Sequence, residues 1–175
     1  MIYDLVKPDH VLLRTKLDRF NFNNPPINPH ELANNLIETM IHYNGIGLSA
    51  NQCGLPYRVF VLWSNPTKVM FNPTIADIST EEVMLEEGCL TYPNLFIKIK
   101  RPKLVRVRYT DSFGEAQTDK FTGMTARCVL HEMDHLDGFN FTHKSNKFHF
   151  DQAMRQKNKR EKSYKVPSHE QNQSS

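Results

Sequence analysis

The chain contains the sequence His131-Glu132-Met133-Asp134-His135, and the rest of the chain is organised around this stretch. Two histidines four residues apart lie on one face of a helix, about 40° apart around its axis, so both can bind one metal ion. Glu132 lies about 100° round from His131 and would present its carboxylate beside that ion. This HExxH arrangement is typical of metal-dependent hydrolases, in which the glutamate is the base. The alternative is two surface histidines on an amphipathic helix, because the spacing also recurs by chance.

The residues around this stretch indicate an α+β fold. The metal-binding helix is predicted to cover residues 123–137 and to be closed by Gly138, a residue favoured just beyond a helix end. An earlier helix should begin at Asn28-Pro29-His30-Glu31, which supplies an N-cap and a first-turn proline, and end at Gly45. β-branched, aromatic or alternating residues predict strands at 57–63, 68–72, 95–100, 104–110 and 116–121, the first two ended by Asn65-Pro66 and Asn72-Pro73. We therefore expect antiparallel strands packed around a central helix.

Length and composition set the class of protein. The chain has 175 residues and suits one apolar core. It contains neither a run of eighteen apolar residues nor a basic, then apolar N-terminus, so we expect a cytoplasmic protein with no membrane span. Three scattered cysteines, Cys53, Cys89 and Cys128, argue against a disulfide framework and for reduced thiols or metal ligands.

Charge divides the chain into two parts. The net charge is +3, but residues 144–175 alone carry eight lysines or arginines against three acidic residues. We predict a catalytic domain at 1–143 and a basic extension at 144–175, with a short helix followed by disorder. Its basic residues favour a phosphate backbone, and the alternative is a solvated extension. Apolar residues in it form a stripe over 147–163, namely Phe148, Phe150, Ala153 and Met154.

A third metal ligand separates the candidate enzyme classes, because catalytic metals are usually held by three protein ligands. One class of metalloendopeptidase continues as H-E-x-x-H-x-x-G-x-x-H, but the last position here is Phe141. Cys128 lies on the helix a turn before His131 and is interpreted as a pocket wall, and Cys53 is the weaker candidate. Cys89 follows Gly88 outside the helix and can approach from a third direction, so we choose Cys89. A metalloendopeptidase and a closed, non-catalytic metal domain remain the alternatives.

Three motifs together resemble those of the peptide deformylases. They are Gly45-Ile46-Gly47-Leu48-Ser49-Ala50-Asn51-Gln52, then Glu87-Gly88-Cys89-Leu90-Thr91, then the HExxH pentapeptide, in the family's order. The resemblance runs from about Pro8 to Phe141 and does not cover the tail. Ser49 and Thr91 stand where alanine and serine are common, and both replacements are small.

The resemblance implies a metal-dependent hydrolase. Its ligands would be Cys89, His131 and His135, holding one divalent metal, Fe²⁺ in the cell, with Zn²⁺ or Ni²⁺ able to substitute; a thiolate suits these ions over Mg²⁺ or Ca²⁺. Glu132 would be the general base, while the Gln52 side chain and the Leu90 backbone N–H would stabilise the oxyanion. The family also pairs the residues matching Glu87 and Arg101, a pair that we interpret as structural.

The implied substrate is the N-terminal formyl-methionine of a nascent polypeptide. The peptide would lie extended against the backbone of Gly45, Ile46, Gly47 and Gly88. An apolar pocket for the methionine is expected from Ile46, Leu85, Met124 and Cys128. Phe96 and Arg127 depart from the family pattern, so side-chain preference could differ. We expect a monomer that has no membrane contact and could meet the ribosome through its basic tail.

Overall fold

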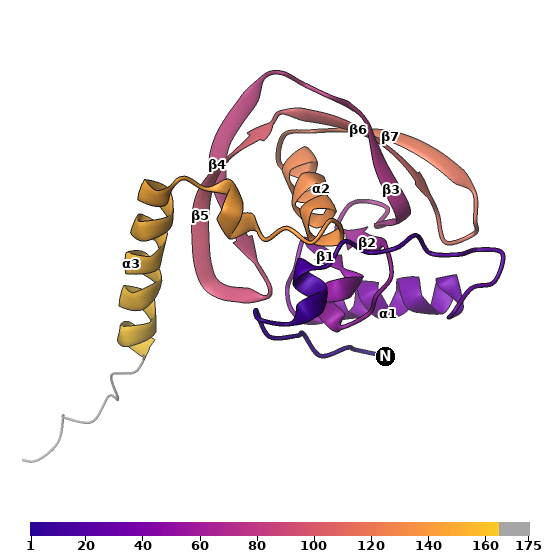
Figure 1. Cartoon of the computed structure of the whole chain (residues 1–175), viewed down its shortest axis with the longest axis horizontal. Coiled ribbons are helices and arrows are strands. Elements are labelled where there is room, and N and C mark those ends of the chain that lie inside the picture. The colour runs from indigo at the N-terminus through magenta and orange to yellow at the C-terminus, as the bar shows by residue number, and fades with distance from the viewer. Residues whose placement is uncertain (165–175) are drawn as a thin grey trace, which may run out of the picture.

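The computed structural model describes residues 1–164, and it confirms the expected α+β fold (Figure 1). Five antiparallel strands form one sheet in the order β1-β2-β3-β6-β7, and β4 and β5 form a two-stranded hairpin. Helix α2 lies in the middle, enclosed by the strands, and α3 lies beside β5. The elements are η1 (Val11–Arg14), α1 (Pro29–His42), β1 (Gly47–Ser49), η2 (Ala50–Cys53), β2 (Val59–Leu62), β3 (Lys68–Ile78), β4 (Glu82–Cys89), β5 (Tyr92–Pro102), β6 (Leu104–Thr110), β7 (Ala116–Thr122), α2 (Gly123–Leu136), η3 (Phe141–Lys144) and α3 (Lys147–Tyr164).

The large sheet is covered on both faces, and strand β2 shows why. Its four residues are all apolar and all buried, because alternate side chains enter opposite faces of the sheet. Val59 and Val61 join the core formed with α1, whereas Phe60 and Leu62 join the core formed with α2. The sheet therefore fixes α2 against one face and carries β1, which supplies part of the site, at its edge.

Strand β3 differs from the prediction, which ended it at Asn72-Pro73. It continues to Ile78 through a shift in its pairing with β6 between Phe71 and Thr74. Asn72 adopts a positive φ of 51°, and its side-chain amide exchanges hydrogen bonds of 2.7 and 2.9 Å with the backbone of Phe20. A bulge stabilised by a distant backbone segment thus replaces the expected strand end.

Helix α3 packs against β5 through an apolar cluster. The alternation Leu95, Ile97, Ile99 places these side chains on the buried face of β5, where Phe141 and Ala153 meet them. Phe150 and Met154 pack on the same cluster, as the predicted stripe requires, but Phe148 is exposed. The helix has 18 residues and covers the range of the predicted stripe, 147–163. The predicted disorder after it lies outside the described residues. Within the described part, no helix has the length and hydropathy of a membrane span.

One buried carboxylate joins β4, β5 and α2. Glu87 on β4 accepts two hydrogen bonds from Arg101 of β5, at 2.8 and 2.9 Å, and one from Arg127 of α2 at 2.6 Å. Its second oxygen lies 3.1 Å from Nδ1 of His131. The Glu87–Arg101 pair was expected, but Arg127 as a third partner was not. Burial opposes ionisation of Glu87, yet hydrogen bonds from Arg101 and His131 outweigh burial and lower its pKa to about 2.

Arg127 also explains how the hairpin is fastened to the helix. Its guanidinium donates to the carbonyl oxygen of Ile99 at 2.9 Å and to that of Val83. Arg101 in turn pairs with Asp134 of α2 at 2.6 Å. Both strands of the hairpin are therefore tied to α2 by charged groups that are themselves almost wholly buried.

Replacing Glu87 by alanine should destabilise the fold by about 3–5 kcal/mol, because two buried guanidinium groups lose their shared partner. Urea unfolding followed by circular dichroism measures the change. Glu86→Ala is the matched control: Glu86 is the exposed neighbour on the same strand, and its loss should change stability by less than about 0.5 kcal/mol.

The stabilisation of the fold by Glu87 should decrease as the pH falls. The pKa of Glu87 is lowered from 4.5 to about 2 on folding, so its stabilisation is complete above about pH 4.5 and is lost as the pH falls toward 2. Equal stability of the Glu87→Ala and Glu86→Ala proteins at pH 7 would contradict this role.

Candidate metal centre and active site

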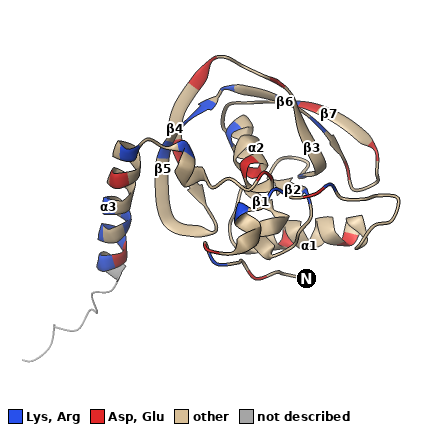
Figure 2. Cartoon of the chain, in the orientation of Figure 1, with Lys and Arg blue, Asp and Glu red and all other residues tan. Residues whose placement is uncertain are grey.

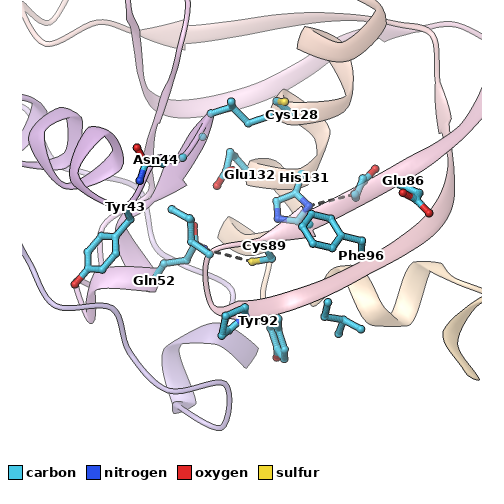
Figure 3. Close-up of a pocket in the computed structure, with 18 of the residues that line it drawn as sticks. Tyr43, Asn44, Gln52, Glu86, Cys89, Tyr92, Phe96, Cys128, His131 and Glu132 are labelled. Atoms are coloured by element: carbon cyan, nitrogen blue, oxygen red, sulfur yellow. Dashed lines mark hydrogen bonds and ion pairs between the residues drawn. The ribbon is translucent and has the colours of Figure 1, made fainter. Parts of the chain in front are cut away.

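Three potential metal ligands converge where the end of β4 meets α2, and Figure 3 shows two of them, Cys89 and His131. The ligand atoms of Cys89, His131 and His135 all lie within 4.8 Å of one another. Cys89 Sγ is 3.2 Å from Nε2 of His135, and the two imidazole rings lie with their centroids 4.9 Å apart. The structure therefore brings together the three predicted ligands. One sulfur and two imidazole nitrogens form a donor set suited to Fe²⁺ or Zn²⁺.

Cys89 reaches this position because β4 changes its pairing there. Gly88 lies opposite Phe96, but the next residue, Cys89, lies opposite Tyr92. Burial disfavours the charged thiolate, yet His135 and His131 beside it outweigh burial and hold the pKa of Cys89 well below its usual value. Thiolate is the form that binds metal, so the site is prepared for it.

His131 is oriented by Glu87 behind it. Because the carboxylate lies against Nδ1, the other nitrogen, Nε2, is directed toward the site. Burial lowers the pKa of His131, but its contacts with Cys89 and Glu87 reverse that effect and raise the pKa to about 10. A cation between Cys89 and His131 would take the place of this proton, so the donor set fits a divalent metal.

The other two cysteines do not belong to the ligand cluster. Burial, reinforced by the charge of Glu132, raises the pKa of both Cys53 and Cys128 to about 12. Both thiols are buried and remain in the neutral form. Cys128 lines the cavity beside the site, as its interpretation as a pocket wall requires.

Glu132 lies next to the ligands with a free oxygen. It is buried, and its Oε2 has no hydrogen-bond partner among the described residues. Burial raises its pKa, although His131 and His135 oppose the shift. Gly47 makes room for it, because a Cβ at Gly47 would lie 2.5 Å from Glu132 Oε1. A buried carboxylate with an unused acceptor beside a metal site is suited to take a proton from water.

Gln52 faces the same space with its amide oriented by neighbours. Its Oε1 accepts from the backbone N–H of Ser49 at 2.9 Å and from the Ser49 hydroxyl at 3.0 Å. The amide nitrogen is thereby turned toward Thr91 Oγ1 at 3.1 Å and Cys89 Sγ at 3.5 Å. A donor held beside the ligand cluster can stabilise an oxyanion formed there. The replacements Ser49 and Thr91 both contact this amide.

A cavity of about 610 Å³ opens beside the cluster. Of the predicted residues, those lining it are Gly45, Ile46, Gly47, Gln52, Gly88, Cys89, Leu90, Met124, Cys128, His131 and Glu132. Leu85 and His135 are not among the lining residues, whereas Arg127, which crosses from α2 to the β4–β5 hairpin, is one of them. The lining also includes Tyr43 and Asn44, in the turn after α1, and Tyr92 and Asn94, in the first part of β5. Sequence reasoning missed these four residues because none belongs to a recognisable motif.

Comparison with known proteins identifies the family. The family model described as polypeptide deformylase matches residues 2–151. A peptide deformylase of Wolbachia pipientis (strain wPip) is 38% identical over 148 residues, covering 77% of this chain and 83% of the relative. The crystal structure of a peptide deformylase from Synechococcus elongatus in complex with actinonin superposes with a TM-score of 0.82 at 30% identity, covering 89% and 86% of the two chains. That of Thermotoga maritima gives a TM-score of 0.79 at 33% identity, covering 83% and 99%. The chain therefore belongs to the peptide deformylase family.

Proposed function

We propose that the site formed by Glu132, Gln52 and the three ligands hydrolyses the formyl group from the N-terminal formyl-methionine of nascent polypeptides. The observation that supports this assignment most directly is the free oxygen of buried Glu132 beside the cluster of Cys89, His131 and His135. Formate and a free methionine amine are the products. The family membership already makes the chain a metal-dependent hydrolase, and the proposal concerns which residues perform each role.

Glu132 acts as general base and then as general acid. It takes a proton from the water that attacks the formyl carbon, and it returns that proton to the departing amine nitrogen. Its raised pKa suits both halves of the exchange, because a carboxyl that binds protons more readily is a better base. A bound divalent cation would supply Lewis acidity, lowering the pKa of a water molecule to about 7.

Gln52 and Leu90 stabilise the charge that develops on the formyl oxygen. The Gln52 amide is held with its nitrogen toward the cluster, so the side chain does not have to reorient when the oxyanion forms. The Leu90 backbone N–H is the second donor, and Leu90 lines the same cavity directly after the ligand Cys89.

The peptide binds in an extended conformation between two strand edges. In the described part of the chain β1 pairs only with β2, and β4 pairs only with β5, so each has a free edge. Gly45, Ile46 and Gly47 on one side and Gly88 on the other supply backbone groups for this strand addition. The methionine side chain then enters the cavity between Ile46, Met124 and Cys128.

The metal is Fe²⁺ in the cell, with Zn²⁺ or Ni²⁺ able to replace it. Support comes from the donor set, because a thiolate and two imidazoles favour these ions over Mg²⁺ and Ca²⁺. The endopeptidase pattern finds no counterpart, since its third ligand position is Phe141, which is buried in the apolar cluster with β5.

Glu132→Gln should keep the fold and the metal but lose about 10²- to 10⁴-fold in kcat on a short formyl peptide, because only the proton-transferring group is removed. Formate release and metal content by mass spectrometry are measured together. Loss of the metal from this variant would show that Glu132 is a ligand and would overturn the role given to it.

Cys89→Ala should lose both metal and activity, because a catalytic site with two protein ligands binds its metal weakly. Cys53→Ala is the control: it removes a buried thiol that lies outside the cluster and should keep the metal. Retained metal in Cys89→Ala, or lost metal in Cys53→Ala, would refute the ligand set.

The outer face of α3 is proposed to contact the ribosome, which presents the substrate in the cytoplasm. Arg155, Lys159 and Lys162 are exposed along this helix, whose blue residues stand out in Figure 2. Side chains spaced in this way lie on one face, and basic groups on a helix favour phosphate backbones. The inner face is occupied by packing on β5, so the two faces have separate tasks.

The triple substitution Arg155→Glu, Lys159→Glu and Lys162→Glu should weaken binding to purified ribosomes and reduce its salt dependence. Turnover of a free formyl tripeptide should stay within twofold of the wild-type value, since none of these side chains lines the cavity. Co-sedimentation at several salt concentrations measures the first effect. Unchanged ribosome affinity would leave the tail a solvated surface.

A further inference from the structure

The wall of the cavity contains an unusual segment of β5. Tyr92 pairs with Cys89 of β4, and Phe96 pairs with Gly88. Because Gly88 and Cys89 are consecutive, the three residues between Tyr92 and Phe96 have no partner on β4. Asn94, in the middle of this bulge, has a positive φ of 64°. This left-handed conformation is uncommon for residues with a side chain, and asparagine adopts it more readily than most.

Helix α3 contacts this bulge with a buried side chain and a cation. Leu95 packs in the apolar cluster with Ala153 of α3. Arg160 donates a hydrogen bond to the carbonyl oxygen of Asn94 at 3.3 Å. Its guanidinium also lies 5.1 Å from the centre of the Phe96 ring, a distance at which a cation is attracted to an aromatic face. One arginine thus connects the C-terminal helix to the middle of the bulge and to Phe96 at its end.

Phe96 connects Arg160 to the cavity, because its ring contacts Arg160 and the residue lines the cavity. Its ring covers Gly88, since a Cβ at Gly88 would lie 2.8 Å from it. Phe96 and Asn94 both line the cavity, and 44% of the surface of Phe96 is exposed. A ring that is half exposed on a cavity wall can adopt other rotamers unless a neighbour restrains it. Among the described residues, Arg160 is the cation that lies over this ring.

We propose that Arg160 is a positioning residue for peptide binding. It holds the Phe96 ring over Gly88 and holds the bulge at Asn94, so that the wall against which the peptide lies is formed before the peptide arrives. This inference rests on the proposed binding of the peptide along Gly88. It gives the C-terminal helix a role in substrate affinity that is separate from its outer, basic face.

The test is steady-state kinetics of Arg160→Ala in the full-length, metal-loaded protein with formyl-Met-Ala-Ser. KM should rise about three- to tenfold while kcat stays within twofold, because the residue acts on binding and does not touch the reacting atoms. Arg160→Lys should restore part of the lost affinity, since an ammonium can also lie over the ring. The melting temperatures of the variants show whether the fold is retained.

Two control variants separate this role from charge and helix effects. Arg106→Ala removes an exposed arginine from β6, and Gln156→Ala shortens an exposed side chain one turn earlier on α3. Both should leave KM within twofold of the wild-type value. An equal rise in KM for Arg106→Ala would assign the effect to net charge, and an equal rise for Gln156→Ala would assign it to the helix, and either result would overturn the proposal.

A double-mutant cycle with Phe96→Leu tests the route through the ring. If Arg160 acts through Phe96, Arg160→Ala should raise KM by less than twofold in the Phe96→Leu background. A full additional rise would overturn the proposal. Wild-type turnover with an unchanged KM in Arg160→Ala would refute this inference alone, whereas absence of formate release from the wild-type protein would refute the proposed function.

Discussion

The buried carboxylate of Glu87 is the interaction on which the site depends. Removing a carboxylate from water is costly unless charged partners surround it, and here two arginines and one histidine do so. Because these partners come from β5 and α2, their convergence fixes the hairpin against the helix. The same carboxylate orients His131, while the strand that carries it continues to Cys89 two residues later. The Glu87 carboxylate therefore contributes both to the stability of the fold and to the geometry of the ligands.

The sequence predicts the residues of the site more completely than it predicts the strands around them. The relation between His131, Glu132 and His135 is local, since helical periodicity alone determines it. The structure places both histidines in the ligand cluster and Glu132 on the wall of the cavity beside it. The sequence of β4 does not predict a strand, because it contains several exposed acidic residues and its apolar residues do not alternate with polar ones. The bulge at Asn72 depends on Phe20, fifty-two residues earlier, and no local pattern encodes such a partner. The sequence position of Leu85 predicts a pocket residue, but Arg127 lines the cavity and Leu85 does not.

The C-terminal helix shows how a charge pattern can hide a packing role. Its lysines and arginines indicated a separate extension, yet its inner face covers β5 and its Arg160 contacts the cavity wall. The family match also continues to residue 151, past the proposed boundary at 143. The division at 143 stays a prediction, but the apolar contacts make removal of α3 a poor way to study the tail, because β5 would lose its cover. Substitutions on single faces of the helix separate its roles.

The most direct test of the whole account is the product formed by the metal-loaded wild-type protein. Formyl-Met-Ala-Ser and an unformylated, unfolded polypeptide are incubated in parallel, and formate and new amino termini are quantified. The account predicts formate in stoichiometric amounts with the free tripeptide and no cleavage of internal peptide bonds. Cleavage of the unformylated polypeptide without formate release from the tripeptide would contradict it.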